Sequence, residues 1–357
     1  MNVREATKDY EQWMRGCAPV VESHLRAKHA LMKEGSFDFL RGTYYRWAAL
    51  WSEVCRECVH APKVMSVGDL HVDNFATWRD GEGRLCWGVD DFDEAALLPY
   101  TNDLIRLAVS VKIAKKLGWM ETKTKVACDA IVAGYEKALK QGGCPIVLAE
   151  EQTHLEKLGI DALEPPEGFW EKLTACPQVR RGVPREAKAS LEEALPNPRP
   201  EYRVVQRMAG VGSLGQQRFV AIAKCAGGWI AREAKRMVPA ASEWVAGRTG
   251  HRQSCYAQTI GRAVRSHDPY QKISGQWLIR RLSPDSNPIK MEELSGKRDE
   301  ETLLQAMGSE TANVHLGSKR QVNRIQKDLR RRKSNWLRSA ATKMEKVTLR
   351  EWKEYRD

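Results

Sequence analysis

Two short acidic segments near the start of the chain carry the residue types that phosphoryl transfer requires. In Gly68–Asn74, an asparagine follows Asp69 by five positions. The second segment, Val89–Glu94, begins about twenty residues after Asp69 and contains an Asp-Phe pair. Phosphoryl transfer from a nucleotide needs a carboxylate that orients the attacking group, and an amide and a second carboxylate that hold magnesium on the phosphates. The spacing therefore predicts an enzyme that uses ATP and Mg²⁺.

The side-chain chemistry assigns expected roles within these segments. Asp69 is the candidate catalytic carboxylate, and His71 beside it is expected to brace the loop by hydrogen bonding rather than to react. Asn74 and Asp91 are the candidate magnesium ligands, with Asp93 as a further one, because Mg²⁺ prefers oxygen ligands and takes only one or two carboxylates. Each acid taken singly reads more simply as a turn or helix-capping residue. Their combination favours function.

A glycine-rich segment later in the chain predicts a loop that covers phosphates. It separates two segments that read as strands, 203–208 and 218–224. A dinucleotide fingerprint would continue into a helix, whereas a glycine loop between antiparallel strands is the kinase arrangement. An ordinary glycine-rich hairpin turn is the alternative. The candidate phosphate-binding residues of the loop are Gly210, Gly212, Ser213 and Gly215.

The next predicted strand, 229–237, carries Arg232 and Lys235. A cation on this strand can reach the α- and β-phosphates of a nucleotide, as the corresponding lysine does in kinases. Successive side chains of a strand point to opposite faces, so only one of the two cations can face the cleft. The sequence does not distinguish them. Glu233 or Glu243 is expected to pair with the cation that does.

The elements that position these residues are predicted to be helices and short strands. Prolines accumulate between 143 and 200, which predicts a connector or irregular insertion. Gly35 is expected to end the first helix and Ser36 to cap the second. The predicted helices are 18–34, 37–58, 103–139, some helix near 186–194, 251–265 and most of the chain from Met291. The further predicted strands are 64–67, 85–89 and 276–282.

Composition excludes several classes of protein. The 357 residues suffice for one large domain or two lobes. There is no apolar run of 18 residues and no apolar signal segment, so we expect a cytoplasmic protein without membrane contact. Nine cysteines, an odd and scattered set, do not form a disulfide framework. Cys55 and Cys58 form a single C-x-x-C without the second pair that structural zinc needs, so they read as two buried thiols.

The net charge of +12 is concentrated at the C-terminus, because residues 319–357 hold 14 Lys/Arg and five Asp/Glu. Such a segment can contact nucleic acid weakly through phosphates. A solvated helix face is the favoured interpretation. Apolar residues can give this helix a buried side: Trp336, Leu337, Met344, Val347 and Trp352.

Several motifs together resemble the family called domain of unknown function 2252. They are Phe39-Leu40-Arg41-Gly42, Gly68-Asp69-Leu70-His71-x-x-Asn74-Phe75, Asp91-Phe92-Asp93-Glu94, Asp103-Leu104-x-Arg106-Leu107-Ala108-x-Ser110, the 210–215 loop and the 312–318 stretch with His315. That family resembles the aminoglycoside phosphotransferase and choline kinase branch of protein-kinase-like folds, which use an H-G-D-x-H-x-x-N loop and an I-D-F loop. This chain has Val67 in place of the first His, and Arg232 where the family mostly has a lysine.

The resemblance implies an α+β, protein-kinase-like fold of two lobes, a mainly helical large lobe and a small antiparallel β lobe. In ordinary kinases the glycine loop precedes the catalytic loop, whereas here it follows by about 140 residues. We therefore expect a circular permutation, which requires termini that lie close together at the surface. The expected parts are 1–142 (catalytic part of the large lobe), 143–200 (connector), 201–290 (β lobe) and 291–357 (helices returning to the large lobe). Permutation requires Gly212 to lie within about 11 Å, two helical turns, of the Asp69/Asp91 cluster.

These residues predict an ATP- and magnesium-dependent phosphotransferase that acts on an unknown hydroxyl acceptor. A second interpretation is an inert kinase-like protein that binds nucleic acid or another partner through its basic C-terminal helix. Transfer of AMP instead of phosphate is a third. Gly68-Asp69-Leu70-His71 also resembles the opening motif of binuclear metallophosphatases, but the chain has neither G-D-x-x-D-R nor G-N-H-[DE] downstream.

Overall fold

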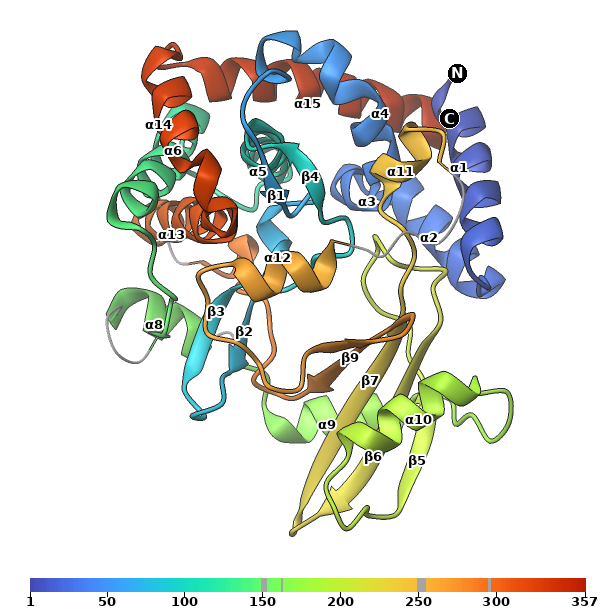
Figure 1. The fold of residues 1–357 in the computed structure, drawn as a ribbon. Coiled ribbons are helices and arrows are strands. Elements are labelled where there is room, and N and C mark those ends of the chain that lie inside the picture. The colour runs from blue at the N-terminus through green and yellow to red at the C-terminus, as the bar shows by residue number, and fades with distance from the viewer. Residues whose placement is uncertain (149–152, 162, 249–254, 295–296) are drawn as a thin grey trace.

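Helices from both ends of the chain build the larger part of the molecule, and one antiparallel sheet from its middle builds the smaller part (Figure 1). The computed structural model describes residues 1–148, 153–161, 163–248, 255–294 and 297–357. Every strand pair in it is antiparallel. The predicted α+β class is therefore confirmed.

The N-terminal helices are α1 (Val3–Cys17), α2 (Glu22–Glu34), α3 (Ser36–Gly42) and α4 (Tyr44–Val54). Helix α1, which the sequence did not predict, begins with a capping box between Asn2 and Glu5. The prediction of one helix over 37–58 is wrong, because Thr43 leaves the helical region (φ −122°, ψ 36°) and separates α3 from α4. Ser36 is the first residue of α3 rather than its cap, a position that Gly35 takes.

Two small antiparallel strand pairs position the acidic segments. Strand β1 (Lys63–Ser66) pairs with β4 (Ala96–Pro99), and β2 (Phe75–Arg79) pairs with β3 (Leu85–Val89). The predicted strands 64–67 and 85–89 are thus confirmed as β1 and β3, in separate sheets. A short 3₁₀ turn, η2 (Val72–Asn74), connects the first acidic segment to β2.

A central helix lies beneath the acidic segments. Helix α5 (Thr101–Lys116) is buried along most of its length, and α6 (Thr124–Gln141) follows it. The single helix predicted over 103–139 is therefore two, separated at Gly118, whose φ of +81° is left-handed. Most of the remaining core lies between these helices and those of the C-terminus.

The prediction that the chain is mostly helical from Met291 is confirmed. The elements are η3 (Met291–Glu293), α13 (Lys297–His315), η4 (Leu316–Gln321), α14 (Val322–Arg331) and α15 (Trp336–Arg356). Helix α15 has the expected apolar side, where Leu337 and Met344 are buried, and it packs on α5. Its end returns to α1, since a side-chain nitrogen of Arg4 donates to the carbonyl oxygen of Tyr355 at 3.3 Å. The two termini are neighbours in Figure 1.

The small sheet has the order β5-β6-β7-β9-β8. Four of its strands were predicted, and β8 was not. Its strands are β5 (Tyr202–Gln206), β6 (Arg218–Cys225), β7 (Gly228–Arg236), β8 (Lys272–Ser274) and β9 (Trp277–Leu282). Between β7 and β8 lie α11 (Ala241–Val245) and α12 (Tyr256–Arg262). The helix predicted over 251–265 is thus shorter, and residues 251–254 lie outside the described part.

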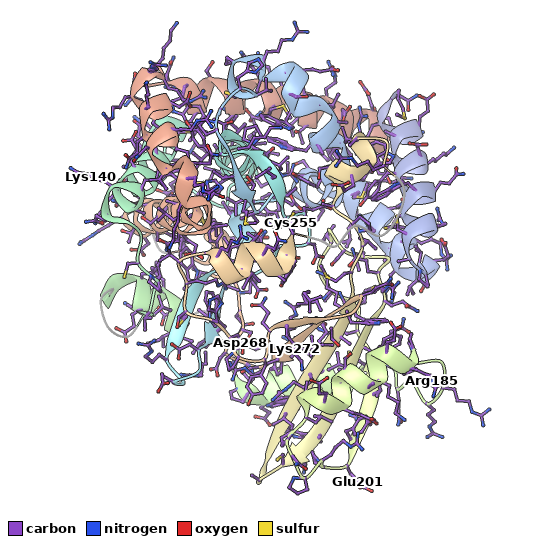
Figure 2. All side chains as sticks on the ribbon, in the orientation of Figure 1. Lys140, Arg185, Glu201, Cys255, Asp268 and Lys272 are labelled. Carbon is purple, nitrogen blue, oxygen red and sulfur yellow. The ribbon has the colours of Figure 1, made fainter. Side chains whose placement is uncertain are left out.

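The proline-rich stretch contains three described helices and covers both faces of the sheet. They are α8 (Thr153–Asp161), α9 (Pro166–Thr174) and α10 (Arg185–Ala194). Leu173 of α9 packs with Val220 on one face, and Leu191 of α10 packs with Ala221 on the other. The helix predicted near 186–194 is confirmed as α10. Side chains fill both parts, with Arg185 and Glu201 at the sheet end and Lys140 on α6 at the far end (Figure 2).

No helix among the described residues is long and apolar enough to cross a bilayer. Cys55 and Cys58 are buried free thiols, at the end of α4 and in the short turn η1 (Arg56–Cys58) respectively.

Candidate functional site

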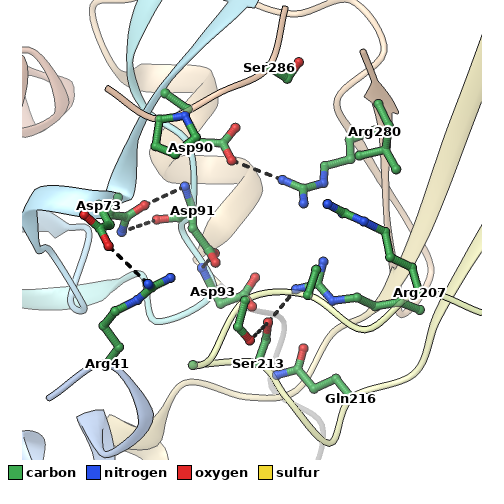
Figure 3. Close-up of a pocket in the computed structure, with 18 of the residues that line it drawn as sticks. Arg41, Asp73, Asp90, Asp91, Asp93, Arg207, Ser213, Gln216, Arg280 and Ser286 are labelled. Carbon is green, nitrogen blue, oxygen red and sulfur yellow. Dashed lines mark hydrogen bonds and ion pairs between the residues drawn. The ribbon is translucent and has the colours of Figure 1, made fainter. Parts of the chain in front are cut away.

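A cavity of about 500 Å³ lies where the helical part meets the sheet. Its walls come from distant parts of the chain, as Figure 3 shows, with the acidic side chains on one side and cations of the sheet on the other. Of the predicted site residues, the following line it: Asp69, His71, Asn74, Asp91, Asp93, Gly210, Gly212 and Ser213.

Asp69 is presented by a tight turn that follows β1. Gly68 has a φ of +86°, and a Cβ there would lie 2.2 Å from the carbonyl oxygen of Glu94, so only glycine fits. One carboxylate oxygen of Asp69 accepts a hydrogen bond from Arg106 Nε at 2.9 Å. Burial raises the pKa of Asp69, and the Arg106 guanidinium opposes that rise. The result is a buried carboxylate with one oxygen held by α5.

One face of α5 holds the rest of this turn. Asp103 accepts a hydrogen bond from the backbone N–H of Val67 at 2.7 Å, and Ser110 accepts one from Val72 at 3.0 Å. His315 donates to Asp103 at 3.0 Å from the end of α13. The sequence analysis noted these residues only as part of a motif and missed their roles. The separations of three and seven residues between Asp103, Arg106 and Ser110 were the available signal, because such residues share a helix face.

Asn74 ties the two acidic segments together. Its amide nitrogen donates to the backbone oxygens of Asp69 at 3.0 Å and Asp91 at 3.1 Å, and its Oδ1 accepts from the Asp91 N–H at 2.9 Å. The Asp91 side chain is 46% exposed. Although burial alone would raise it, the pKa of Asp91 is held well below its usual range by Lys235 and Arg280. Asp91 is therefore an ionised carboxylate at the cavity wall.

Lys235 is the strand cation that faces the acids. Its Nζ contacts Asp93 and lies 3.6 Å from Asp91, and its side chain is only 2% exposed. Arg232 points to the opposite face of β7, where it stacks on the Tyr270 ring at 3.9 Å and donates to a backbone oxygen of α10 at 3.0 Å. Burial and the neighbouring Asp91 carboxylate raise the pKa of Asp93. Lys235 thus neutralises the second acidic segment.

The prediction that Glu233 or Glu243 pairs with the strand cation is wrong. Glu233 pairs with arginines of the sheet rather than with Lys235 or Arg232. Glu243 pairs with Arg248 at 3.3 Å. The alternation of side chains along β7 puts Glu233 and Lys235 on the same face, but the sheet supplies Glu233 with nearer cations from its neighbouring strands.

His71 does not brace the loop through Nδ1, which is buried without a hydrogen-bond partner in the described structure. The ring lies edge-on to Phe37, with centroids 6.0 Å apart. Burial, with Arg41 and Arg106 nearby, holds the pKa of His71 well below its usual range. His71 is therefore a neutral imidazole. Arg41, from the end of α3, lies near His71 and forms an ion pair with Asp73 at 3.2 Å.

The glycine loop lies against Asp69. A Cβ at Gly212 would lie 3.7 Å from Asp69 Oδ2 and 3.3 Å from the carbonyl oxygen of Arg41. This is well inside the separation that a permuted kinase-like arrangement requires. Gly215 lies outside the cavity lining, and its carbonyl oxygen accepts from the Val21 N–H at 2.8 Å. Lys28 of α2 donates to the Gly212 carbonyl at 2.9 Å. This residue was not predicted from the sequence as part of the site.

The donors at the cavity fit a magnesium ion bound largely by phosphate. Asp91 offers an ionised, half-exposed carboxylate, and Asn74 Oδ1 lies beside it with a second lone pair. Mg²⁺ is usually held by one or two carboxylates together with substrate phosphates. In the ranges that the structure describes, there is no group of three or more His, Cys, Asp or Glu side chains that could hold a metal ion.

These features define an α+β protein with a polar cavity between a helical part and an antiparallel sheet. Residues 20–168 match the sequence model of a family described as "Uncharacterized protein conserved in bacteria (DUF2252)". The match covers both acidic segments and the α5 motif, and it supports the resemblance drawn from them. The glycine loop and the 312–318 stretch lie beyond it. The chain matches no curated protein and no solved structure.

Proposed function

We propose that this chain is a magnesium-dependent phosphotransferase that uses ATP as donor and a hydroxyl compound as acceptor, on a circularly permuted kinase-like fold. The observation that carries the proposal is the approach of the glycine loop to the acidic segments. About 140 residues separate Gly212 from Asp69, yet a Cβ at Gly212 would lie 3.7 Å from its carboxylate. The neighbouring termini also suit a permuted chain.

Several of the predicted side chains have a role in this reaction. Asp69 orients the acceptor hydroxyl and takes its proton through the oxygen that Arg106 leaves free, and a raised pKa makes it a better base near neutral pH. Asn74 and Asp91 would hold Mg²⁺, which would neutralise charge on the phosphates. Lys235 holds Asp91 and Asp93 in position. Backbone N–H groups of 210–212 would cover the phosphate chain.

Replacement of Asp91 tests this proposal. We expect ATP with Mg²⁺ to raise the melting temperature of the wild-type protein, and Asp91→Ala to abolish that rise because the metal loses its ionised ligand. Asp129→Ala is the matched control, since Asp129 is exposed on α6 and its only ion pair among the described residues is with Lys125 at 2.9 Å. The measurement is a thermal-shift assay with and without Mg²⁺. An equal shift in Asp91→Ala and wild type would contradict the assignment.

Labelled nucleotides distinguish phosphate transfer from AMP transfer. If the protein is incubated with cell extract as a source of acceptors, phosphotransfer puts the γ-label of ATP into product. Transfer of AMP would instead put the α-label there. Incorporation of the α-label alone would overturn the proposed reaction while leaving nucleotide binding in place.

A second candidate is a non-catalytic protein that binds nucleic acid, favoured by a basic surface away from the cavity. The turn η4, helix α14 and the residues directly after this helix, in the upper left of Figure 1, carry exposed cations for which the described residues provide no carboxylate partner. They are Lys319, Arg320, Lys327, Arg330, Arg331 and Lys333. Salt-dependent RNA or DNA binding without any binding of ATP would favour this candidate.

A further inference from the structure

Three arginines from three strands converge on one buried carboxylate in the sheet wall of the cavity. Glu233 of β7 is fully buried and accepts from Arg207 at 3.1 Å, from Arg218 at 3.0 Å and from Arg280 at 2.8 Å. Although burial alone would raise it, the pKa of Glu233 is held well below its usual range by these guanidinium groups. Glu233 is therefore a fixed anion that orients three cations.

The register of the sheet explains this convergence. Glu233 lies opposite Arg280 of β9, and Arg218 of β6 lies opposite Lys235, two residues along β7. Arg207 directly follows β5, and its N–H donates to the Arg218 carbonyl at 3.3 Å. All of these side chains share the face that looks toward the acidic segments. None of the three arginines was predicted as functional from the sequence, because the cluster joins residues up to 73 positions apart.

The three arginines retain unused donors on the cavity side. A guanidinium has five N–H donors, and within the described part of the chain Arg207 uses one of them, in its bond to Glu233. Arg280 uses two nitrogens, on Glu233 and on Asp90 at 3.1 Å. Arg218 also contacts the Ser213 hydroxyl of the glycine loop. All three arginines line the cavity, and Figure 3 shows Arg207 and Arg280 extending into it.

Buried polar atoms without a partner indicate that this cavity takes a polar ligand. Among the described residues, Arg218 Nε, Gln216 Oε1 and His71 Nδ1 have no hydrogen-bond partner. Their side chains line the cavity, and each of these residues is more than nine-tenths buried. An unsatisfied buried polar group costs about 1–3 kcal/mol, which a polar ligand recovers by drawing these side chains toward the cavity. A purely structural cluster would need only one or two cations to neutralise Glu233.

We infer that Arg207, Arg218 and Arg280 form the binding site for an oligophosphate chain, with Glu233 as the residue that positions them. Arginine matches phosphate through planar, paired N–H···O bonds, which a lysine cannot make. The site also places Ser213 and the glycine loop beside the bound oligophosphate. The main phosphate contacts thus come from these arginines rather than from Arg232 or Lys235. A role of this site in catalysis rests on the proposed function. The binding of an oligophosphate by the three arginines does not.

The site can be tested with inorganic tripolyphosphate, which has the phosphate chain but no nucleoside. We expect wild-type protein to bind it in calorimetry without added metal, and Arg207→Gln to weaken that binding by at least about tenfold. Arg207 is the most exposed of the three arginines, so this change disturbs the fold least. Arg203→Gln is the matched control, because Arg203 lies on the same face of β5 but outside the cavity lining and donates to the Thr174 carbonyl at 2.9 Å.

Further arms separate this inference from the proposed function. Asp91→Ala should bind tripolyphosphate at least as tightly as the wild type, because that binding needs no metal and the change removes a negative charge from the cavity wall. Adenosine should bind much more weakly than tripolyphosphate, and inorganic phosphate more weakly than either ATP or tripolyphosphate. Tripolyphosphate binding by Arg207 without any transfer from ATP would sustain the site and refute the phosphotransferase. Equal affinities in wild type and Arg207→Gln, with magnesium-dependent ATP binding intact, would refute the arginine site alone.

Discussion

Burial and hydrogen bonding together set the chemistry of individual carboxylates at this cavity. Asp69 and Asp91 have the same side chain and lie on two segments that Asn74 links by hydrogen bonds. Burial raises the pKa of Asp69, whereas Lys235 and Arg280 overcome the effect of burial and lower the pKa of Asp91. The two environments suit a base and a metal ligand respectively. Two carboxylates with separated pKa values are the usual basis for assigning different roles.

Glu94 gives a prediction of pH-dependent stability. Its Oε2 accepts from the Ala241 N–H at 2.6 Å, and burial raises its pKa from 4.5 to about 8. Below pH 4.5 both folded and unfolded chains are protonated here; between 4.5 and 8 only the unfolded chain loses the proton. The free energy of unfolding therefore falls across that window. Glu94→Gln should remove this fall and raise stability at pH 8 by about 4 kcal/mol.

Urea denaturation at a series of pH values measures this effect. Glu136→Gln is the control, because Glu136 is exposed on α6. If the wild type and Glu94→Gln lost stability in parallel between pH 5 and 8, Glu94 would not be the group responsible.

At the scale of elements, the N-terminal segment holds the glycine loop closed. The Val21 N–H donates to Gly215 at 2.8 Å, and Lys28 donates to Gly212 at 2.9 Å. Burial lowers the pKa of Lys28 to about 8, so this contact includes a cation that is partly neutral in mildly alkaline solution. These two contacts hold the loop beside Asp69 at the cavity wall.

Lys28→Met should loosen the loop. Loss of the side-chain donor is expected to speed amide hydrogen exchange of residues 210–216 severalfold, with little change in the core helix α5. Lys33→Met is the matched control, because Lys33 lies on the same helix but is exposed. Mass-spectrometric hydrogen exchange makes the measurement. Unchanged exchange in 210–216 would show that Lys28 does not restrain the loop.

The predictability of these elements from sequence follows from how local their causes are. The strands β1 and β3 and the helices of the C-terminus follow from short apolar runs and helical periodicity, and they were predicted. The break at Thr43 was not, because a non-helical backbone at a threonine has no strong sequence signal. The acidic segments and the loop were predicted from spacing. The arginine cluster around Glu233 was not, since it depends on strand register, which a single sequence does not specify.

At the scale of the whole molecule, the account depends on two segments far apart in sequence that share one cavity. The helical part contributes acids, and the sheet contributes the loop and the arginines, so opposite charges face one another across the space (Figure 3). The termini lie together on the other side of the helical part. The basic surface of η4 and α14 lies at a further site, separate from the cavity. Nucleotide chemistry and polyanion binding would thus be separable functions.

The most direct test of this account is calorimetric titration of ATP into the wild-type protein with and without magnesium. The account predicts saturable binding at one site with Mg²⁺. It also predicts an affinity for ATP at least about tenfold lower when the metal is chelated, because Asp91 and Asn74 then hold no metal ion against the phosphates. Absence of ATP binding in the presence of Mg²⁺ would contradict the central claim.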